Sequence, residues 1–116
     1  IYNGGIIAPG VNLSIKSLES SADQIPIFSI KRQKKIIGKN TVEALRSGFY
    51  WGYVGLITNI ILKIEKETKK KYKIIFTGGY AKLFKTSIIR SFIVDRNITI
   101  RGIIEIFKLN KSILIK

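Results

Sequence analysis

The stretch Ile37–Gly55, IGKNTVEALRSGFYWGYVG, decides how the middle of the chain folds. Asn40 can accept a hydrogen bond from a backbone N–H group of a first helical turn, and Glu43 can reach back to the N–H of Asn40. The helical pattern starts at Thr41 and continues to about Thr68. We therefore predict one long helix over this range.

One side of this predicted helix carries only small residues. They fall within roughly 80° of one another at about 100° per residue, and bulky apolar residues fill the remaining circumference. A helix that is apolar nearly all round is expected to be buried. Each interior glycine costs about 1 kcal/mol relative to alanine, so close packing against a neighbour, or a ligand, is expected to compensate, with packing alone the simpler explanation. The small residues are Thr41, Ala44, Gly48, Gly52 and Gly55.

The composition excludes several kinds of chemistry. A chain of 116 residues that is 46% hydrophobic with 2 Pro is expected to fold as one domain. With 0 Cys, 0 His and 0 Met it has no disulfides, no thiolate nucleophile, no zinc site of the usual ligand types and no histidine acid–base relay. The absence of an initiator Met and the large Ile1 lead us to predict a fragment of a longer protein.

The charge of the chain is strongly positive. A formal net charge of +14 suits nucleic acid or an anionic membrane surface, but the abundance of Ile and Lys is also what compositional drift produces. The basic runs Lys31–Lys35 and Lys66–Lys73 fall at predicted element boundaries, where solvated runs are the default. The uncharged run Ser47–Leu62 is shorter than the ~20 apolar residues of a spanning helix. We expect neither a nucleic-acid nor a membrane partner.

The rest of the chain alternates short extended and helical patterns. Together with the long helix, this order predicts an α/β fold with a small sheet packed with helices, read as strand, helix, helix, strand, helix, helix. The tail after Asn110 stays unassigned. The predicted elements before the long helix are a strand-like run around Ile6 and Ile7, a helix of about 13 residues through Val11, Ile15, Leu18 and Ala22 that stops before Pro26, and an irregular connection with an extended piece at Ile27–Ile30. After it come a strand at Tyr72–Phe76, a helix that can begin in Tyr80–Ile89, an extended piece at Phe92–Val94 and a helix at Thr99–Leu109.

No pair of acids is suited to catalysis. Glu65 lies with Glu67 in a lysine run, where both are expected to be solvated, whereas Glu43 is explained by helix capping. Asp95 is expected to be a turn residue. We assign no catalytic residue and no metal ligand. The seven acids are Glu19, Asp23, Glu43, Glu65, Glu67, Asp95 and Glu105.

Two features could bind a ligand. Thr41 lies at the start of a helix, where unpaired N–H groups favour a polar or anionic ligand, although it could instead supplement the cap made by Asn40. Thr77, Gly78 and Gly79 follow a strand and precede a helix start, a geometry in which backbone N–H groups can face a phosphate or ribose. The simpler interpretation of the glycine pair is a turn.

Several motifs together resemble the C-terminal half of the type III pantothenate kinases. They occur in the order of that family and cover nearly the whole chain. The matching pieces are GGIIAPG (Gly4–Gly10), the following NLS helix that ends near Pro26, IGKNTVEALRSGFYWGYVG (Ile37–Gly55), TGG (Thr77–Gly79) and DRNITIRGI (Asp95–Ile103).

This resemblance implies a fragment of an actin-like, sugar-kinase-like ATPase with a ribonuclease H-like fold, in which residues 1–116 supply most of the second lobe. Such enzymes transfer the γ-phosphoryl group of ATP to pantothenate, the first step toward coenzyme A, with Mg²⁺ and a monovalent cation, K⁺ or NH₄⁺. The resemblance also implies a cytoplasmic homodimer whose active sites draw on both subunits.

The resemblance assigns roles to the same residues. Thr41 matches the substrate-binding threonine of the GxxT motif of the family, and Thr77, Gly78 and Gly79 match a loop near the nucleotide. The phosphate-binding loop, the Asp base with its adjacent Arg, and the DxGTA-type segment of the family all precede the GG motif and are not in this chain. We therefore expect no kinase activity from the chain alone. The alternatives are a non-catalytic dimerisation or structural module and a basic nucleic-acid-binding domain.

Overall fold

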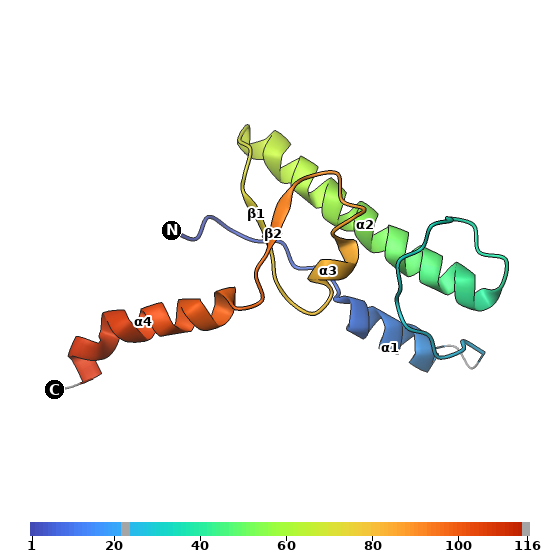
Figure 1. Ribbon diagram of the computed structural model, residues 1–116, viewed down its shortest axis with the longest axis horizontal. Helices are drawn as coiled ribbons and strands as arrows, with labels where there is room; N and C mark the ends of the chain where they lie inside the picture. The colour runs from blue at the N-terminus through green and yellow to red at the C-terminus, as the bar shows by residue number, and fades with distance from the viewer. Residues whose placement is uncertain (22–23, 115–116) are drawn as a thin grey trace. The chain divides into compact units, whose positions relative to one another are not determined.

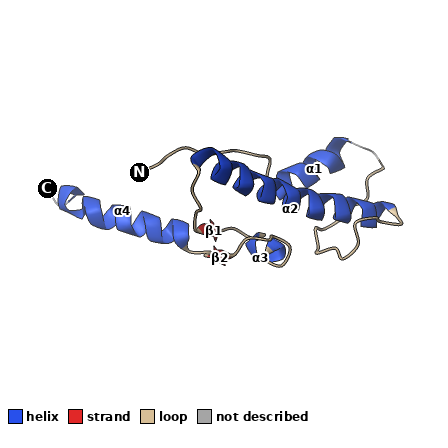
Figure 2. Ribbon diagram, turned by 90° about the horizontal axis from the view of Figure 1, so that it is seen from above, coloured by secondary structure: helices blue, strands red, loops and turns tan. Residues whose placement is uncertain are grey.

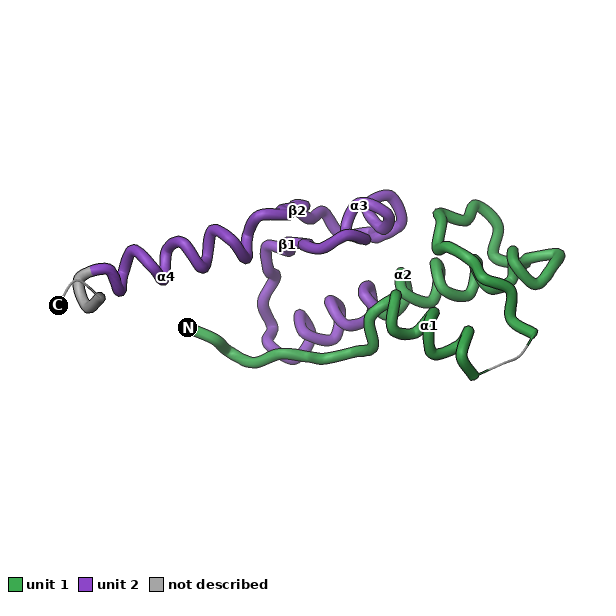
Figure 3. Tube along the Cα trace, turned by 90° about the horizontal axis from the view of Figure 1, so that it is seen from below, with its two compact units in different colours: residues 1–56 green, residues 57–116 purple. Residues whose placement is uncertain are grey.

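A computed structural model describes residues 1–21 and 24–114. The chain divides into two compact units, Ile1–Leu56 and Ile57–Lys116, shown in green and purple in Figure 3. The elements labelled in Figure 1 mix helices with a small sheet, so the predicted α/β class is confirmed. They are α1 (Val11–Ser21), α2 (Thr41–Thr68), β1 (Ile74–Phe76), α3 (Ala81–Phe84), β2 (Phe92–Val94) and α4 (Ile98–Leu114).

The long helix α2 has the predicted bounds, and its start has the predicted cap. The backbone N–H of Glu43 donates to Asn40 Oδ1 at 2.9 Å. Glu43 Oε2 accepts from the backbone N–H of Lys39 at 2.9 Å, not from that of Asn40 as predicted. The carboxylate thus reaches one residue further back, and it ties the preceding loop to the helix as well as closing the cap.

In the first unit, apolar side chains from both helices and from the connection between them are buried. The connection between α1 and α2 is irregular as predicted, and it supplies Phe28 and Ile30 to the buried set. Phe28 packs edge-on against Phe49, with ring centroids 5.2 Å apart. Ala22, predicted to continue the first helix, and Asp23 lie outside the described residues. The buried apolar residues of this unit are Val11, Ile15, Phe28, Ile30, Tyr50 and Val54.

In the second unit, two short strands, coloured red in Figure 2, pair in parallel. Ile74 pairs with Phe92 and Phe76 with Val94. The predicted strand Tyr72–Phe76 is thus shorter than expected, and the predicted extended piece becomes its partner. The rings of Phe76 and Phe92 pack with centroids 4.0 Å apart. The connection between the strands contains α3, a crossover of the kind that parallel strands require.

Three predictions about the elements are wrong. The strand-like run at the N-terminus is irregular, because residues 1–10 are exposed and no described strand pairs with them; an extended segment needs such a neighbour to bond its backbone groups. The element order is therefore helix, helix, strand, helix, strand, helix. The last helix begins at Ile98 and runs to Leu114, into the tail that the sequence left unassigned.

The prediction that α2 is buried is also wrong. Ser47, Tyr50 and Val54 are its buried residues, whereas every residue of the small side, from Thr41 to Gly55, is exposed. A Cβ added at Gly48 or Gly52 would meet no described atom within 4 Å. A helix that is apolar on all sides can be buried on all sides only if enough neighbouring residues pack around it. The described residues do not supply these neighbours on the small side.

Candidate functional site

The small side of α2 opens into a pocket of about 520 Å³. The floor contains residues with little or no side chain, so the volume exists because nothing projects from the helix there. Thr41 lies at one end of this row, at the first residue of α2. The lining residues from the small side are Thr41, Ala44, Gly48 and Gly52, and larger residues, Phe49 and Tyr53 among them, line the rest.

The tyrosine in the pocket wall is fixed by two polar contacts from the N-terminal part of the chain. Tyr53 Oη donates to the backbone carbonyl of Pro9 at 2.9 Å. It also lies 2.8 Å from Ser14 Oγ, which itself lines the pocket from α1. Phe49 stacks on Tyr53 with ring centroids 6.4 Å apart. The wall is therefore held in place before any ligand enters.

Thr41 is the predicted site residue that this pocket contains. The capping hydrogen bond at the start of α2 is made by Asn40, so the helix does not depend on Thr41 for its cap. Thr41 is exposed, and its hydroxyl can both donate and accept hydrogen bonds at the pocket.

Thr77, Gly78 and Gly79 lie in the loop between β1 and α3, in the second unit, whereas Thr41 belongs to the first. Gly78 has φ +93°, in a region that favours glycine. Ala81 N donates to Gly78 O at 3.4 Å, so the predicted turn is confirmed. No described atom lies within 4 Å of a Cβ built at Gly78 or Gly79, which leaves this backbone accessible.

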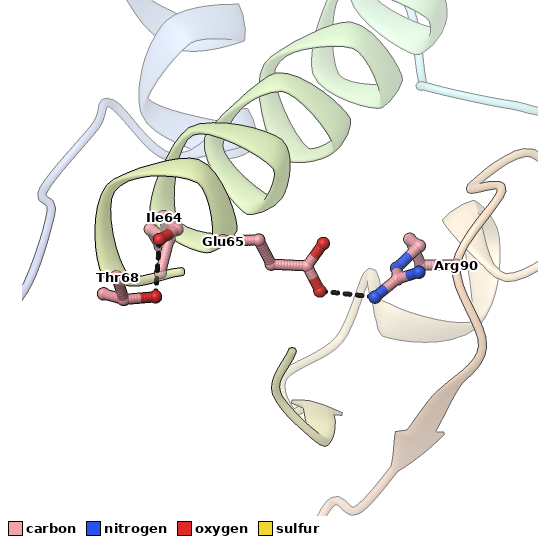
Figure 4. A network of polar contacts seen from close by, with 4 residues as sticks. All are labelled: Ile64, Glu65, Thr68 and Arg90. Carbon is pink, nitrogen blue, oxygen red and sulfur yellow. Dashed lines mark hydrogen bonds and ion pairs between the residues drawn. The ribbon is translucent and has the colours of Figure 1, made fainter. Parts of the chain in front are cut away.

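The acids of the second unit have structural partners. Glu65 was expected to be solvated, but its side chain is only 15% exposed and pairs with Arg90 (Figure 4). The pairing arises because the chain returns past α2 after α3, which the local lysine run does not indicate. Asp95 is a turn residue as predicted: Asn97 N donates to its Oδ1 at 3.0 Å, and Arg101 pairs with it.

In the described ranges, 1–21 and 24–114, no group of three or more His, Cys, Asp or Glu residues could hold a metal ion. No helix in the same ranges is long and apolar enough to cross a membrane.

Sequence reasoning missed a second pocket, of about 650 Å³, on the loop before α2. Arg32, Lys34 and Lys35 of the basic run line it together with Lys39 and Arg46. The available signal was the capping box after Gly38, which folds the loop back on the first turns of the helix. The run alone indicated only a solvated segment.

Comparisons with known proteins give a consistent result. The sequence model of the family described as type III pantothenate kinase matches residues 1–63. A type III pantothenate kinase of Pelagibacter ubique (strain HTCC1062) is 51% identical over 104 residues, which are 90% of this chain and 42% of the relative. One of Phenylobacterium zucineum (strain HLK1) is 39% identical over 113 residues, 96% of this chain and 43% of the relative.

The match extends along the described chain but not along the whole of these relatives. A third relative, the type III pantothenate kinase of Caulobacter vibrioides, is 42% identical over 113 residues, with 94% of this chain and 42% of the relative covered. The chain thus spans less than half the length of the curated relatives it matches. By the family match over residues 1–63 and these identities, the chain belongs to the type III pantothenate kinase family.

Proposed function

We propose that the chain is part of a pantothenate kinase that transfers the γ-phosphoryl group of ATP to the hydroxyl of pantothenate in coenzyme A biosynthesis. The observation that carries the proposal is the pocket beside Thr41, in a chain whose family is type III pantothenate kinase. Phosphoryl transfer depends mainly on positioning and charge stabilisation, so a chain with 0 His and 0 Cys can contribute to it.

Thr41 would bind pantothenate in this pocket. Pantothenate carries hydroxyl, amide and carboxylate groups on a short branched chain, and a threonine hydroxyl can both donate to and accept from such groups. The apolar wall made by Phe49 and Tyr53 suits the hydrocarbon part of the molecule. Thr41 therefore has the role of a substrate-binding residue, not of a base.

Thr77, Gly78 and Gly79 would contact the nucleotide. The absence of side chains at both glycines lets a phosphate or ribose approach the backbone, and the open space around both Cβ positions supports this role. In the proposed enzyme this loop belongs to the second lobe of an actin-like ATPase fold.

Metal ions would be held outside the described residues. Kinases of this kind use Mg²⁺ with ATP, and we include a monovalent cation, K⁺ or NH₄⁺, in the proposal. The residues that the structure describes contain no suitable cluster of ligands, so they do not fit a metal site of their own. No step is therefore assigned to a metal in this chain.

The small side of α2 would contact a second copy of the chain in a cytoplasmic homodimer. Gly48, Gly52 and Gly55 have open space where a Cβ would lie, so an apolar neighbour can approach the helix backbone there. A pantothenate kinase that dimerises through this side of α2 would also have the dimerisation role that the sequence allows as an alternative. No observation favours a nucleic-acid-binding domain over a small-molecule enzyme.

The binding role can be tested by titrating the chain with pantothenate and following the amide and methyl signals of Thr41 by NMR. We expect shifts at Thr41 and at Gly48, and loss of most of the binding in Thr41→Val. Thr58→Val, also in α2 but not among the residues that line the pocket, is the matched control. Binding that survives unchanged in Thr41→Val contradicts the proposed contact.

We expect the chain alone to be inactive, because none of its acids is assigned as the catalytic base and the base that the family resemblance implies is not among its residues. A coupled assay with ATP, Mg²⁺, K⁺ and pantothenate measures this directly. Robust formation of phosphopantothenate by the 116-residue chain would contradict the proposal that the chain lacks the catalytic base, although it would support the kinase reaction itself.

A further inference from the structure

The loop before α2 and the first two turns of that helix enclose a pocket of about 650 Å³ with a strongly positive lining. It shares no lining residue with the pocket beside Thr41. We call it the basic pocket. Its charged lining residues are Arg32, Lys34, Lys35, Lys39, Arg46 and Glu43.

The loop is anchored on α2 by side chains of the helix. Ser47, which is 4% exposed, donates through Oγ to the carbonyl of Ile36 and lies 3.4 Å from the carbonyl of Lys35. Glu43 Oε2 accepts from the backbone N–H of Lys39 at 2.9 Å. A Cβ at Gly38 would lie 2.3 Å from Ala44 N, so the loop backbone is pressed against the helix. The cationic residues are thus attached to a backbone that is already ordered.

The charge of this pocket is not balanced within the described part of the chain. Five cationic residues and one carboxylate line the pocket, and that carboxylate already accepts a backbone hydrogen bond. Among the described residues none of the five forms an ion pair. Arg46, one of the five, has a buried Nε without a hydrogen-bond partner among the described residues. A buried unpaired donor is costly, so the guanidinium of Arg46 lacks part of its usual compensation.

The number of donors indicates what kind of anion fits. Arginine binds phosphate oxygens with two parallel N–H groups, and lysine supplies a compact point charge. The lining carries five positive charges and one negative charge, a net +4 (5 − 1), which one phosphate at about −2 does not balance, whereas two or three linked phosphates come closer to it. We propose that the basic pocket binds a small ligand that carries a diphosphate or triphosphate group. This inference rests on the charge and geometry of the loop, not on the kinase assignment.

Calorimetric titration of the chain with sodium pyrophosphate tests the proposal. We expect Arg32→Gln/Lys34→Gln/Arg46→Gln to weaken binding by roughly tenfold or more, because charge-assisted contacts are lost. The control Lys70→Gln/Lys71→Gln/Lys73→Gln removes the same charge from exposed residues of the second unit and should change the affinity by less than about twofold. Circular dichroism and thermal unfolding of each variant show that the fold is kept.

A gain of affinity gives a test that misfolding cannot imitate. Glu43→Gln keeps an oxygen that can accept from Lys39 N–H but removes the only negative charge among the lining residues. We expect this variant to bind pyrophosphate about threefold more tightly. An affinity that is unchanged or lower contradicts the proposal.

Further titrations distinguish the source of the phosphates. Saturable binding of ATP that pyrophosphate displaces, and that the control variant retains, supports a nucleotide as the natural ligand. No pyrophosphate binding, or an equal loss in both charge variants, overturns the proposal. Tight binding of duplex DNA or of phosphatidylserine vesicles, with pyrophosphate weak, overturns it in favour of a macromolecular surface whose affinity follows total charge.

Discussion

Helices α2 and α4 both contain glycine and both expose apolar residues, but different contacts hold their side chains. In the first half of α2, Ser47 and Tyr53 bond to backbone far away in the sequence, at Ile36 and Pro9. In α4 the partners are near: Lys108 pairs with Glu105 at 2.7 Å, three residues away. The difference shows that α2 organises the loop and chain around it, whereas the described contacts of α4 are local.

The apolar surfaces of the two helices also differ in form. Along α2 the small residues leave a recess that larger residues border, which suits a small molecule or a close helix backbone. Along α4 the exposed residues are large, so the same apolar character forms a ridge. The exposed residues of α4 are Ile100, Ile103, Ile104, Ile106, Phe107 and Leu109.

The largest effect is expected from Gly38→Ala. The new Cβ would lie 2.3 Å from Ala44 N and 2.5 Å from Glu43 C, so the loop or the start of α2 must move. We expect a loss of about 3 kcal/mol in the free energy of unfolding, measured by urea denaturation. Gly102→Ala in α4 is the control, because its Cβ meets no described atom within 4 Å, and helix propensity should make it slightly stabilising. If the two variants were equally stable, the close contact between Gly38 and the start of α2 would contribute nothing to stability, and α2 would not differ from α4 in this respect.

The start of α2 was predictable because its signal is local. Asn40 and Glu43 indicate a cap within one turn, and the structure has the predicted bond to Asn40, although Glu43 accepts from Lys39 instead of Asn40. The pairing of β1 with β2 was only partly predictable: Phe92–Val94 reads as extended, but its neighbour is set by the crossover through α3. Pairing between distant segments depends on contacts that no local pattern encodes.

The pocket beside Thr41 could be predicted in part, because helical geometry alone puts the threonine and the glycines on one side. The exposure of that side could not be predicted, since it depends on which neighbours the folded chain supplies. The position of Glu65 shows the same limit. Its lysine-rich surroundings indicate a solvated carboxylate, whereas Arg90 comes from 25 residues further along the chain.

The next largest effect separates a long-range ion pair from a local one. Arg90→Ala leaves Glu65, only 15% exposed, without its partner, and we expect a loss of roughly 1–2 kcal/mol. Lys108→Ala in α4 removes an ion pair whose side chains are 63% and 64% exposed, so the change should stay below about 0.5 kcal/mol. Thermal and urea unfolding of both variants measure the losses in the free energy of unfolding. Similar losses would show that the long-range ion pair contributes no more than the local one.

Replacing the glycines of α2 should stabilise the isolated chain. Gly48→Ala and Gly52→Ala add a methyl group where no described atom lies within 4 Å, and each should raise the free energy of unfolding by roughly 0.5–1 kcal/mol. The same changes should weaken pantothenate binding or dimer formation, since they fill the recess. Gly102→Ala is the control, which should gain stability without either loss. Destabilisation by Gly48→Ala would show that a neighbour already occupies this side of α2.

The smallest change in stability is expected on the ridge of α4. Ile103 and Phe107 are both 57% exposed and lie one turn apart, so Ile103→Glu/Phe107→Glu should alter the free energy of unfolding by less than about 0.5 kcal/mol. The variant should nevertheless self-associate less than the parent chain in light scattering at increasing concentration, because an exposed apolar surface promotes association. Two added carboxylates also lower the +14 charge, which by itself reduces repulsion between chains and favours association. The control Asn3→Glu/Asn59→Glu makes the same charge change at exposed polar residues. If only the α4 variant associates less than the parent chain, the apolar ridge causes the association. If the two variants associate equally, the ridge is not the cause.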